Sequence, residues 1–325
     1  MILLTGATGY LGSQIAREII ARKLPLRVLA RDPARLAFDP AVAGCEVLTG
    51  DLTDLAAART ALDGVESLIH TAALVKMWVR DPREFWRINV AGFQNLLQTA
   101  VNSGVRRIIY TSSFIALGPS DYASADESLV HHGPFANEYE KTKAQALSWL
   151  RAQEGRYPIV TLLPGVIYGP GPRTDGNLVG GMMDQYLAGR FPGLLGDGNQ
   201  RWSFAYNADV VAAHLAALEK GKPGELYVLG GDNRSLNDFF RALAEVSGVR
   251  QPVRRLPYSV GELVGSMEVF RARFFGHAPQ LTPGVVEIFK RDWVYSSAKA
   301  QRELGYRVTP LEEGLRRTLS DLAIK

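Results

Sequence analysis

The chain of 325 residues has one cysteine, Cys45, so an internal disulfide framework is excluded. Its five histidines show no spacing, to one another or to Cys45, that is typical of metal ligands. We therefore predict that no metal is bound. Proteins with so little cysteine are usual in reducing compartments, and we predict a cytoplasmic setting.

An excess of charge of one sign is also absent, since 37 Lys and Arg stand against 33 Asp and Glu. No basic run occurs, so we predict no nucleic-acid binding. No basic leader precedes the apolar start, and we expect no export signal. The best candidate for a membrane span, 256–275, contains Glu262, Glu268, Arg271 and Arg273. We predict instead an amphipathic helix whose apolar face packs against the core, and no membrane span.

What the chain contains is the composition of an ordinary globular protein, with 46% hydrophobic and 22% charged residues. In its first half, short apolar runs alternate with helical patterns. The predicted strands are 2–5, 26–30, 45–48, 66–70, 107–111 and 158–163. The predicted helices are 11–22, 54–62, 84–103 and 137–153. This alternation predicts an α/β fold with a Rossmann-like, doubly wound parallel sheet.

A glycine-rich turn joins the first predicted strand to the first predicted helix, with Gly6, Gly9 and Gly12 spaced G-x-x-G-x-x-G. Without Cβ atoms, these positions let a pyrophosphate approach the N–H groups of the helix N-terminus. A plain strand-to-helix turn is the alternative, but the position between strand and helix favours a dinucleotide cradle. The other predicted cofactor contacts in this turn are Thr8, Tyr10 and Leu11.

The end of the second predicted strand bears on the choice between NAD and NADP. An NAD site usually places a carboxylate there, on the ribose 2′-hydroxyl group, but this chain has Ala30 followed by Arg31. A guanidinium group suits the 2′-phosphate of NADP, and we predict NADP in preference to NAD. The alternative is an exposed Arg31 that stacks on the adenine. The adjacent Asp32 also places a carboxylate close to this position, which makes the choice between NAD and NADP less distinct.

Two more segments follow predicted strands. Asp51 and Leu52 come after the third strand, where a carboxylate would lie near the adenine amino group. Ala72 and Ala73 come after the fourth, where small residues let the chain pass close under a cofactor. A helix N-cap and tight packing are the structural alternatives. The position of both segments directly after successive strands favours cofactor binding.

Tyr139 and Lys143 lie one turn apart on a predicted helix. A phenol with a pKa near ~10 is a weak base at neutral pH, but a neighbouring ammonium group favours the phenolate. We predict that Tyr139 exchanges a proton with the substrate oxygen and that Lys143 assists it. Such pairs are common on helices, so a third member is needed. Of the two serines that follow the fifth predicted strand, we predict that Ser113, rather than Ser112, hydrogen-bonds the reacting carbonyl.

The pattern changes after residue 164, where proline and glycine cluster up to Gly176. We predict an NAD(P)-binding Rossmann domain over 1–164, with a return segment near 204–222. We assign 165–325 mainly to a smaller α+β substrate-binding lobe. Its predicted helices lie near 177–189, 208–220, 235–247, 257–273 and 310–322.

Together these motifs resemble the extended short-chain dehydrogenase/reductases, also described as NAD-dependent epimerase/dehydratases. The segments that carry the resemblance span nearly the whole chain: TGATGYLG at 5–12, GDLTD at 50–54, HTAA at 70–73, INVAG at 88–92, TSSFIALG at 111–118, YEKTK at 139–143, LPGVIYGPG at 163–171 and KAQRELGY at 299–306. The resemblance implies that Ser113, Tyr139 and Lys143 are the catalytic triad. It also implies that the nicotinamide contacts are Pro164, Gly165 and Val166.

Within this family the chain is most similar to dihydroflavonol-reductase-like and farnesol-dehydrogenase-like proteins. The likeness implies an NAD(P)-dependent enzyme that interconverts an alcohol and a carbonyl on a hydrophobic small molecule. A nucleotide-sugar epimerase or dehydratase with tightly held NAD is the alternative, and a non-catalytic dinucleotide sensor is less favoured because the triad is retained. By analogy with related dimers, helices 84–103 and 137–153 would form a homodimer.

The predicted substrate pocket is mainly apolar, which suits an isoprenoid, an aromatic or another hydrophobic compound. Its predicted residues are Lys76, Trp78, Phe114, Met183, Arg201 and Trp202, joined by Met77, Leu117, Met182, Tyr186 and Phe191. Each apolar member has a place in the core between the lobes as its alternative. In a nucleotide-sugar enzyme, Lys76, Arg173 and Arg201 would bind the diphosphate.

Overall fold

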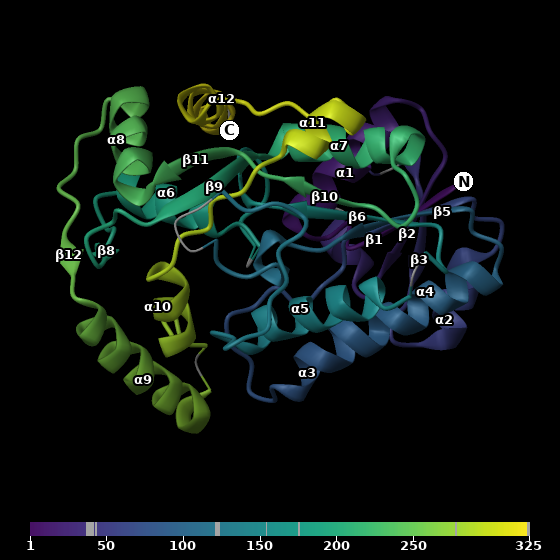
Figure 1. Cartoon of the computed structure of the whole chain (residues 1–325), viewed down its shortest axis with the longest axis horizontal. Helices are drawn as coiled ribbons and strands as arrows, with labels where there is room; N and C mark the ends of the chain where they lie inside the picture. The colour runs from purple at the N-terminus through teal and green to yellow at the C-terminus, as the bar shows by residue number, and fades with distance from the viewer. Residues whose placement is uncertain are drawn as a thin grey trace.

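The centre of the protein is a sheet of seven parallel strands, drawn in the computed structural model with helices above and below it (Figure 1). The structure describes residues 1–36, 42, 44–120, 124–153, 155–174, 176–276 and 278–323. The strands are β1 (Ile2–Thr5), β2 (Leu26–Ala30), β3 (Glu46–Thr49), β4 (Ser67–His70), β5 (Arg107–Thr111), β6 (Ile159–Pro164) and β10 (Leu226–Leu229). Their order is β3-β2-β1-β4-β5-β6-β10, so the chain winds outward in both directions from β1.

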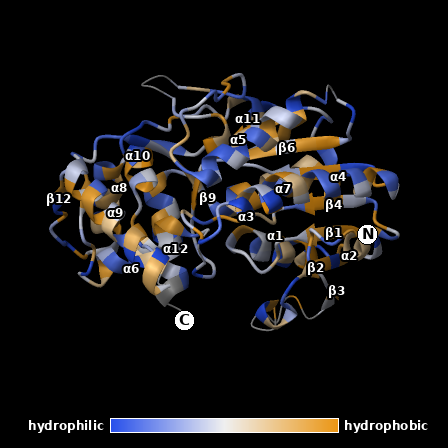
Figure 2. Cartoon of the chain, turned by 90° about the horizontal axis from the view of Figure 1, so that it is seen from below, coloured by the Kyte–Doolittle hydropathy of each residue, from blue (hydrophilic) through white to orange (hydrophobic). Residues whose placement is uncertain are grey.

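Helices cover both faces of this sheet because successive side chains of a strand point to opposite faces. Leu3 packs in the core under one layer of helices, whereas the next residue, Leu4, packs under the other. One layer contains α1 (Tyr10–Ala21), α7 (Asn207–Lys220) and α11 (Ala298–Leu304); the other contains α2 (Leu55–Leu62), α4 (Phe93–Asn102) and α5 (Glu138–Arg151). Figure 2 shows β6 coloured as a hydrophobic strand. Burial on both faces therefore explains the continuous apolar runs in the sequence.

The predicted doubly wound α/β fold is confirmed. All six predicted strands and four predicted helices of the first half are present, with ends displaced by about two residues or less. The predicted helix 84–103 is a continuous run of α3 (Arg83–Trp86), a π-helical segment η3 (Arg87–Gly92) and α4. The strand β10 was not predicted. It comes from the second half of the chain and pairs with β6 at the edge of the sheet.

The second half also forms smaller sheets beside the main one. β7 (Val166–Tyr168), β9 (Arg201–Tyr206) and β11 (Asp232–Ser235) make one sheet, and β8 (Leu194–Leu195) pairs with β12 (Arg255–Leu256). The helices here are α6 (Leu178–Leu187), α8 (Leu236–Ser247), α9 (Tyr258–Phe275), α10 (Pro283–Phe289) and α12 (Leu311–Ala323). Because α7, β10 and α11 belong to the layers of the main sheet, the chain crosses between the two parts more than once. The division at residue 164 stays a prediction.

The apolar face of α9 differs from its prediction. Phe270 and Phe274 are 61% and 69% exposed, whereas Gly261, Gly265 and Ala272 are buried on the opposite side of the helix. The prediction that the large apolar residues of this segment pack against the core is therefore wrong for most of them, because the helix packs by its small residues. Within the part of the chain that the structure describes, no helix is long and apolar enough to cross a membrane.

Helices α4 and α5 bury their large apolar side chains inside the chain. Phe93, Leu96 and Leu97 of α4 and Leu147 and Leu150 of α5 are all less than a tenth exposed, and Trp149 of α5 is partly buried. The buried side chains are not available to a second copy of the chain, so their patterning lends no support to the predicted homodimer. The homodimer stays a prediction from the family resemblance.

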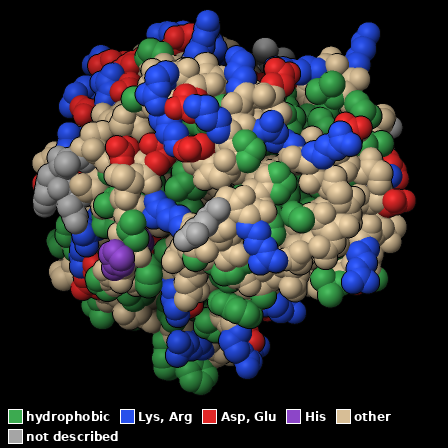
Figure 3. Space-filling view, turned by 45° about the vertical axis from the view of Figure 1, so that its right-hand side comes forward, with side chains coloured by type: hydrophobic (Ala, Val, Ile, Leu, Met, Phe, Trp, Pro, Cys, Tyr) green, Lys and Arg blue, Asp and Glu red, His purple; other side chains and the backbone are tan. Residues whose placement is uncertain are grey.

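Basic and acidic side chains are mixed over the face shown in Figure 3, with hydrophobic side chains between them. This mixture follows from the near balance of 37 Lys and Arg with 33 Asp and Glu. On this face, the charge is therefore mixed rather than gathered into the basic stripe typical of nucleic-acid-binding proteins.

Candidate active site

A pocket of about 650 Å³ lies along the carboxyl edge of the main sheet. Its lining includes residues that end or follow six of the strands: Thr5 and Gly6 (β1), Ala30 and Arg31 (β2), Gly50 and Asp51 (β3), Thr71 (β4), Thr111 (β5), and Pro164 and Gly165 (β6). Ligands of open α/β sheets bind at this edge, and the volume lies within the usual range for small-molecule sites. The topology therefore gathers residues that are far apart in the sequence into one pocket.

Two glycines bring β1, α1 and the segment after β4 into close contact. Gly6 has a φ of +85°, and a Cβ atom there would lie 2.6 Å from Thr71 Oγ1 and 2.7 Å from Ala72 N. A Cβ atom on Gly12 would overlap the carbonyl oxygen of Gly6. The first turn of α1 has no acidic residue, so nothing neutralises its positive dipole end. This bare, tight turn fits the pyrophosphate of a dinucleotide.

The remaining residues that we predicted in this turn also line the pocket. They are Thr8, Gly9, Tyr10 and Leu11. Tyr10 is nearly buried, and its hydroxyl group donates a hydrogen bond to the Gly169 carbonyl oxygen at 3.0 Å. Its phenol group therefore connects α1 to the loop after β7.

Arg31, Arg35, Asp51 and Leu52 line the end of the pocket beside β2 and β3. The Arg31 Nη1 atom lies 3.9 Å from Asp51 Oδ2, and both side chains are largely exposed. Burial raises the pKa of Asp51, but hydrogen bonds from Thr53 and the charge of Arg31 outweigh it, so the net shift of this pKa is downward. This end of the pocket thus holds two guanidinium groups and one ionised carboxylate.

The segment after β4 runs beneath the glycine turn. Thr71 Oγ1 donates to the Thr5 carbonyl oxygen at 2.8 Å. Asn89, in η3, accepts a hydrogen bond from Leu74 N at 2.8 Å and donates to the Leu74 carbonyl oxygen at 3.2 Å and to Thr142 Oγ1 at 3.3 Å. Asn89 therefore anchors this segment to α5. The two alanines that we predicted, Ala72 and Ala73, line the pocket here.

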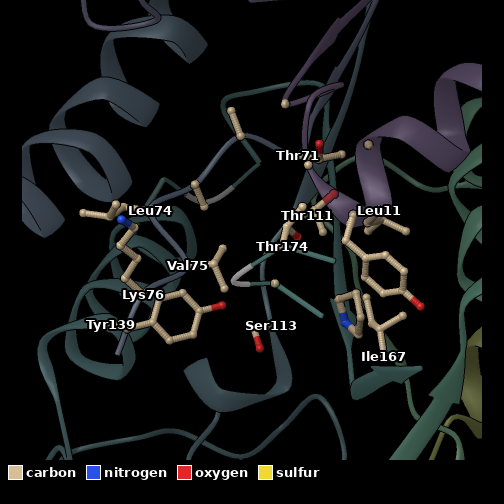
Figure 4. Close-up of a pocket in the computed structure, with 18 of the residues that line it drawn as sticks. Leu11, Thr71, Leu74, Val75, Lys76, Thr111, Ser113, Tyr139, Ile167 and Thr174 are labelled. Carbon is tan, nitrogen blue, oxygen red and sulfur yellow. The ribbon is translucent and has the colours of Figure 1, made fainter. Parts of the chain in front are cut away.

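Ser113, Tyr139 and Lys143 come together on one side of the pocket. Figure 4 shows the Tyr139 hydroxyl group pointing toward Ser113, and the side chain of Ser113 acts to lower the pKa of this phenol. Lys143 Nζ lies 6.0 Å from the centre of the Tyr139 ring and donates to the Thr111 carbonyl oxygen at 3.3 Å. Ser112 also lines the pocket, but only the side chain of Ser113 acts on the pKa of Tyr139. The geometry therefore places the predicted serine, tyrosine and lysine within one cluster.

Burial shifts the pKa values of this cluster in opposite directions. It raises the pKa of Tyr139 to about 12, against a smaller lowering by the side chain of Ser113. It lowers the pKa of Lys143 to about 8, because the ammonium group loses its hydration. At neutral pH, Tyr139 thus keeps its proton, and Lys143 remains mostly charged close to its titration range. A neutral phenol beside an ammonium group of lowered pKa suits proton transfer.

The structure brings only some of the predicted substrate residues to the pocket. Lys76, Met77, Phe114 and Trp202 line it, but Trp78, Met183 and Arg201 do not. The apolar residues that instead pack in or against the core of the second part are Leu117, Met182, Met183, Tyr186 and Phe191. Arg201 Nη2 lies 3.7 Å from Asp292 Oδ2, outside the pocket lining.

Sequence reasoning missed one wall of the pocket. It consists of Gln280, Val285, Ile288, Phe289 and Trp293. The ring of Trp293 lies 5.5 Å from that of Phe114, and the ring of Phe289 lies 4.7 Å from that of Trp202. Nothing in the local sequence pattern identified this wall. Arg35 was also missed, although its position four residues after Arg31 was a usable signal.

The nicotinamide contacts that the resemblance implied, Pro164, Gly165 and Val166, line the pocket between the two parts. Among the described residues, no group of three or more His, Cys, Asp or Glu is placed to hold a metal ion. The residues present therefore fit a dinucleotide and an organic substrate in one continuous space.

A Rossmann-like sheet, a glycine cradle and a serine–tyrosine–lysine cluster at the carboxyl edge define a nicotinamide-dependent enzyme. The model of the NAD dependent epimerase/dehydratase family matches residues 2–230. The chain belongs to this family and is an NAD(P)-dependent enzyme of the extended short-chain dehydrogenase/reductase type, which confirms the family resemblance.

Three relatives match almost the whole chain. "Sterol demethylase protein B" of Methylococcus capsulatus is 32% identical, covering 93% of this chain and 92% of the relative. The "3 beta-hydroxysteroid dehydrogenase/Delta 5-->4-isomerase" of Mycobacterium tuberculosis is 31% identical, covering 94% and 85%. The "4-hydroxy-2-methyl-3-oxo-4-farnesyl-3,4-dihydroquinoline-1-oxide ketoreductase" of Stigmatella aurantiaca is 30% identical, covering 94% and 92%. The crystal structure of gox2253 superposes with a TM-score of 0.79 at 32% identity, covering 100% of this chain and 98% of the other.

Proposed function

We propose that the chain is an NADP-preferring oxidoreductase that interconverts an alcohol and a carbonyl group on a hydrophobic small molecule. One observation carries this proposal: the pocket that contains Ser113, Tyr139 and Lys143 has an aromatic and aliphatic wall. Proton-transfer groups that face an apolar wall suit a substrate with one reacting oxygen on a hydrophobic skeleton.

The nicotinamide of the cofactor supplies hydride transfer to or from the substrate carbon when it is bound. Tyr139 moves the proton at its hydroxyl oxygen: in reduction it protonates the developing alkoxide, and in oxidation it accepts the proton of the alcohol. Ser113 donates a hydrogen bond to the same substrate oxygen. The ammonium group of Lys143 stabilises the phenolate that remains after donation.

The glycine turn, Asp51 and Leu52 would hold the dinucleotide by its pyrophosphate and adenosine. The nicotinamide end would lie against the alanines after β4 and the segment after β6. Lys143 would also hold the hydroxyl groups of the nicotinamide ribose. Each of these groups lines the same pocket, which supports one extended cofactor position.

The preference for NADP rests on the end of β2. Ala30, Arg31 and Arg35 line the pocket there, so no carboxylate of β2 faces the site. Two guanidinium groups suit a 2′-phosphate, which offers oxygens to both. The carboxylate of Asp51, 3.9 Å from Arg31, comes from the neighbouring strand and would orient that guanidinium group.

The substrate class rests on the pocket wall and on the relatives. Trp202, Ile288, Phe289 and Trp293 provide flat apolar surface, which suits a ring system or a prenyl chain. The names of the three relatives specify sterols, 3β-hydroxysteroids and a farnesyl-bearing ketone. We therefore propose a sterol-like or prenylated alcohol or ketone, within the dihydroflavonol-reductase-like and farnesol-dehydrogenase-like branch.

A nucleotide-sugar epimerase or dehydratase is the second candidate, because Lys76 and Arg173 line the pocket and a diphosphate needs cations. Two observations disfavour it. Arg201, which we expected to bind the diphosphate, is outside the lining, and Arg173 already makes hydrogen bonds of 2.5 and 2.7 Å to Asp184. A non-catalytic dinucleotide sensor is less favoured still, because it would not require the assembled triad.

A turnover panel tests the proposal. The full chain is incubated with NADPH, NADH or their oxidised forms, together with sterols, prenyl alcohols, flavonoid-like ketones or UDP-sugars, and nicotinamide absorbance is followed. We expect net oxidation or reduction of the nicotinamide with a hydrophobic substrate, faster with the NADP pair. Stoichiometric retained NAD, with UDP-sugar interconversion and no net change in absorbance, would instead establish the second candidate.

We keep the homodimer and the cytoplasmic setting as part of this proposal. The homodimer draws on the family resemblance alone, because most of the large apolar residues of α4 and α5 are buried within the chain. The cytoplasmic setting draws on the single cysteine. A monomer mass in light scattering would contradict the first, and fractionation of cells that express the chain tests the second.

A further inference from the structure

The outward face of α9 is the most hydrophobic exposed surface of the described chain. More than half of the exposed large hydrophobic side chains lie on this helix, each between 40% and 70% exposed. They are Val260, Leu263, Val264, Met267, Phe270, Phe274 and Phe275. Their spacing of three and four residues places them on one side of the helix, so they form a continuous stripe. Single exposed apolar residues need no explanation, but a continuous stripe indicates a binding surface.

The inward face of α9 is already occupied. A Cβ atom on Gly265 would lie 2.9 Å from the carbonyl carbon of Thr282, and one on Gly261 would lie 2.6 Å from a methyl carbon of Leu195. Ala272 on the same side is 1% exposed. Figure 1 shows α9 at the edge of the molecule, with α10 on its inner side. The helix is thus fixed by close packing, and its apolar stripe faces away from the protein.

The acidic side chains of α9 contact the rest of the protein, whereas its arginines are exposed. Glu262 binds Lys290 at 2.5 Å, and Glu268 accepts hydrogen bonds from the backbone N–H groups of residues 280 and 281. Arg271 falls within the apolar stripe by helical spacing, and both Arg271 and Arg273 are exposed. Neither arginine has an ion-pair partner among the residues that the structure describes. The outward face therefore combines apolar side chains with positive charge and contains no carboxylate.

We propose that this face of α9 seats the protein on the surface of an anionic lipid bilayer. An interfacial helix buries its apolar side chains at the boundary of headgroups and acyl chains, and its basic residues attract anionic headgroups. A second copy of the chain fits this face less well. Two-fold pairing would gather Arg271 and Arg273 of both copies in one interface, with no acid on the stripe to balance them.

The position of α9 connects this surface to the active site. The helix packs against α10, and Val285, Ile288 and Phe289 of α10 form part of the pocket wall. A protein seated by α9 would hold this wall beside the bilayer, where a sterol-like or prenylated substrate dissolves. This link rests on the proposed function, whereas the seating of α9 does not and can be measured without turnover.

Vesicle co-sedimentation of the full chain tests the proposal. The probes are vesicles of phosphatidylcholine alone and of phosphatidylcholine with 30% phosphatidylglycerol, an assay composition of our choice, at low and high salt. A triple variant, Leu263→Gln, Phe270→Gln and Phe274→Gln, removes apolar area from the stripe. A control variant, Leu24→Gln, Leu55→Gln and Val130→Gln, changes three exposed hydrophobic residues elsewhere.

We expect the wild type and the control variant to bind the anionic vesicles and to bind phosphatidylcholine less. The partitioning of the triple variant into vesicles should fall about tenfold or more, because three apolar side chains that would be buried in the bilayer are replaced by polar ones. Arg271→Glu should weaken binding to the anionic vesicles, and high salt should weaken wild-type binding in the same way. Unfolding midpoints of all variants, measured without vesicles, identify any loss of fold.

A label on the stripe gives a readout that is independent of sedimentation. In a Cys45→Ser background, Met267→Cys supplies one thiol for an environment-sensitive dye, with Leu55→Cys as the control position. Only the dye at position 267 should shift to the blue on anionic vesicles. Absence of wild-type binding, or equal binding by the triple variant, would overturn the proposal. So would a concentration-dependent dimer that the triple variant abolishes while vesicles bind neither protein, because α9 would then be an interface between copies.

Discussion

The hydroxyl group of Tyr139 points toward the side chain of Ser113, although the first belongs to α5 and the second follows β5. Burial raises the pKa of Tyr139 to about 12, and the neighbouring Ser113 side chain opposes part of this rise. Lys143 lies one turn further along the same helix, and burial lowers its pKa to about 8. Tyr139 and Lys143 therefore both stay mainly protonated at neutral pH, and Tyr139 keeps its proton until a substrate oxygen accepts it.

Tyr139→Phe should abolish turnover of every accepted substrate while leaving cofactor binding nearly unchanged. The variant retains the ring and removes the hydroxyl proton, and the loss of a general acid typically lowers the rate about 10²–10⁴-fold. Steady-state rates and cofactor titration by fluorescence measure the two effects separately. Tyr186→Phe is the matched control, because Tyr186 is also buried and hydrogen-bonded but does not line the pocket. Undiminished turnover by Tyr139→Phe would refute the proposed mechanism.

Ser113→Ala and Ser112→Ala should have unequal effects, although both serines line the pocket. Of the two, only Ser113 acts on the pKa of Tyr139, and removal of one hydrogen-bond donor to a reacting oxygen typically costs about 10²–10³ in rate. We expect Ser112→Ala to retain turnover within about tenfold of the wild type. The comparison uses kcat for one substrate and one cofactor. A larger loss for Ser112→Ala would show that the wrong serine has been chosen.

Much of this site could be predicted because strand ends determine where residues meet. Gly6, Asp51, Ala72 and Ser113 each follow a parallel strand, and the carboxyl ends of such strands share one edge. The strands themselves were recognisable from their apolar runs, which burial on both faces requires. Short-range patterns were therefore sufficient for the fold and for the polar side of the pocket.

The apolar side of the pocket was not predictable, because helical periodicity shows that a face is apolar but not what covers it. Met183 was expected in the pocket and is fully buried in the core instead. Phe270 was expected in the core and is exposed. Ile288 and Phe289 reach the pocket only because α10 packs across it from more than a hundred residues away in the sequence. Tertiary packing decides these positions.

Arg31→Ala and Arg35→Ala should each weaken the binding of NADP and leave that of NAD almost unchanged. Only the 2′-phosphate offers a second anionic group to these guanidinium groups, and each variant loses charge-assisted hydrogen bonds to it. We expect about a tenfold rise in the dissociation constant of NADP for each variant, with a larger rise in the double variant. Titration of both cofactors by calorimetry measures this.

Arg59→Ala is the control for the two arginine variants, because Arg59 is exposed on α2 and does not line the pocket. It should bind both cofactors as the wild type does. An equal loss of NAD and NADP affinity in Arg31→Ala or Arg35→Ala would mean that these side chains hold the adenine or the pyrophosphate. Such an outcome would remove the basis for the NADP preference.

The unfolding free energy should fall in mild acid because of His214. Burial lowers the pKa of His214 to about 4, against a small opposing effect of its hydrogen bond to Val210. The unfolded chain binds this proton near pH ~6.5, so the stabilisation is complete above that pH and declines as the pH falls toward 4. The shift corresponds to roughly 3 kcal/mol at pH 4. His70, whose pKa burial lowers to about 3, should contribute in the same direction.

Urea unfolding between pH 4.5 and 8 measures this slope. In His214→Gln, the slope below pH 6.5 should become shallower, with the remainder due to His70, even if the variant is less stable at pH 8. His132→Gln, at an exposed position, should keep the wild-type slope.

His214 also contacts the strand that carries the catalytic cluster. His214 Nε2 lies 2.8 Å from Thr111 Oγ1, and the carbonyl oxygen of Thr111 accepts the hydrogen bond from Lys143. Protonation of His214 in the folded chain, near pH 4, would therefore disturb β5 where it meets the catalytic cluster, and the rate should fall as the pH approaches 4. An unchanged slope in His214→Gln would refute this account of acid sensitivity.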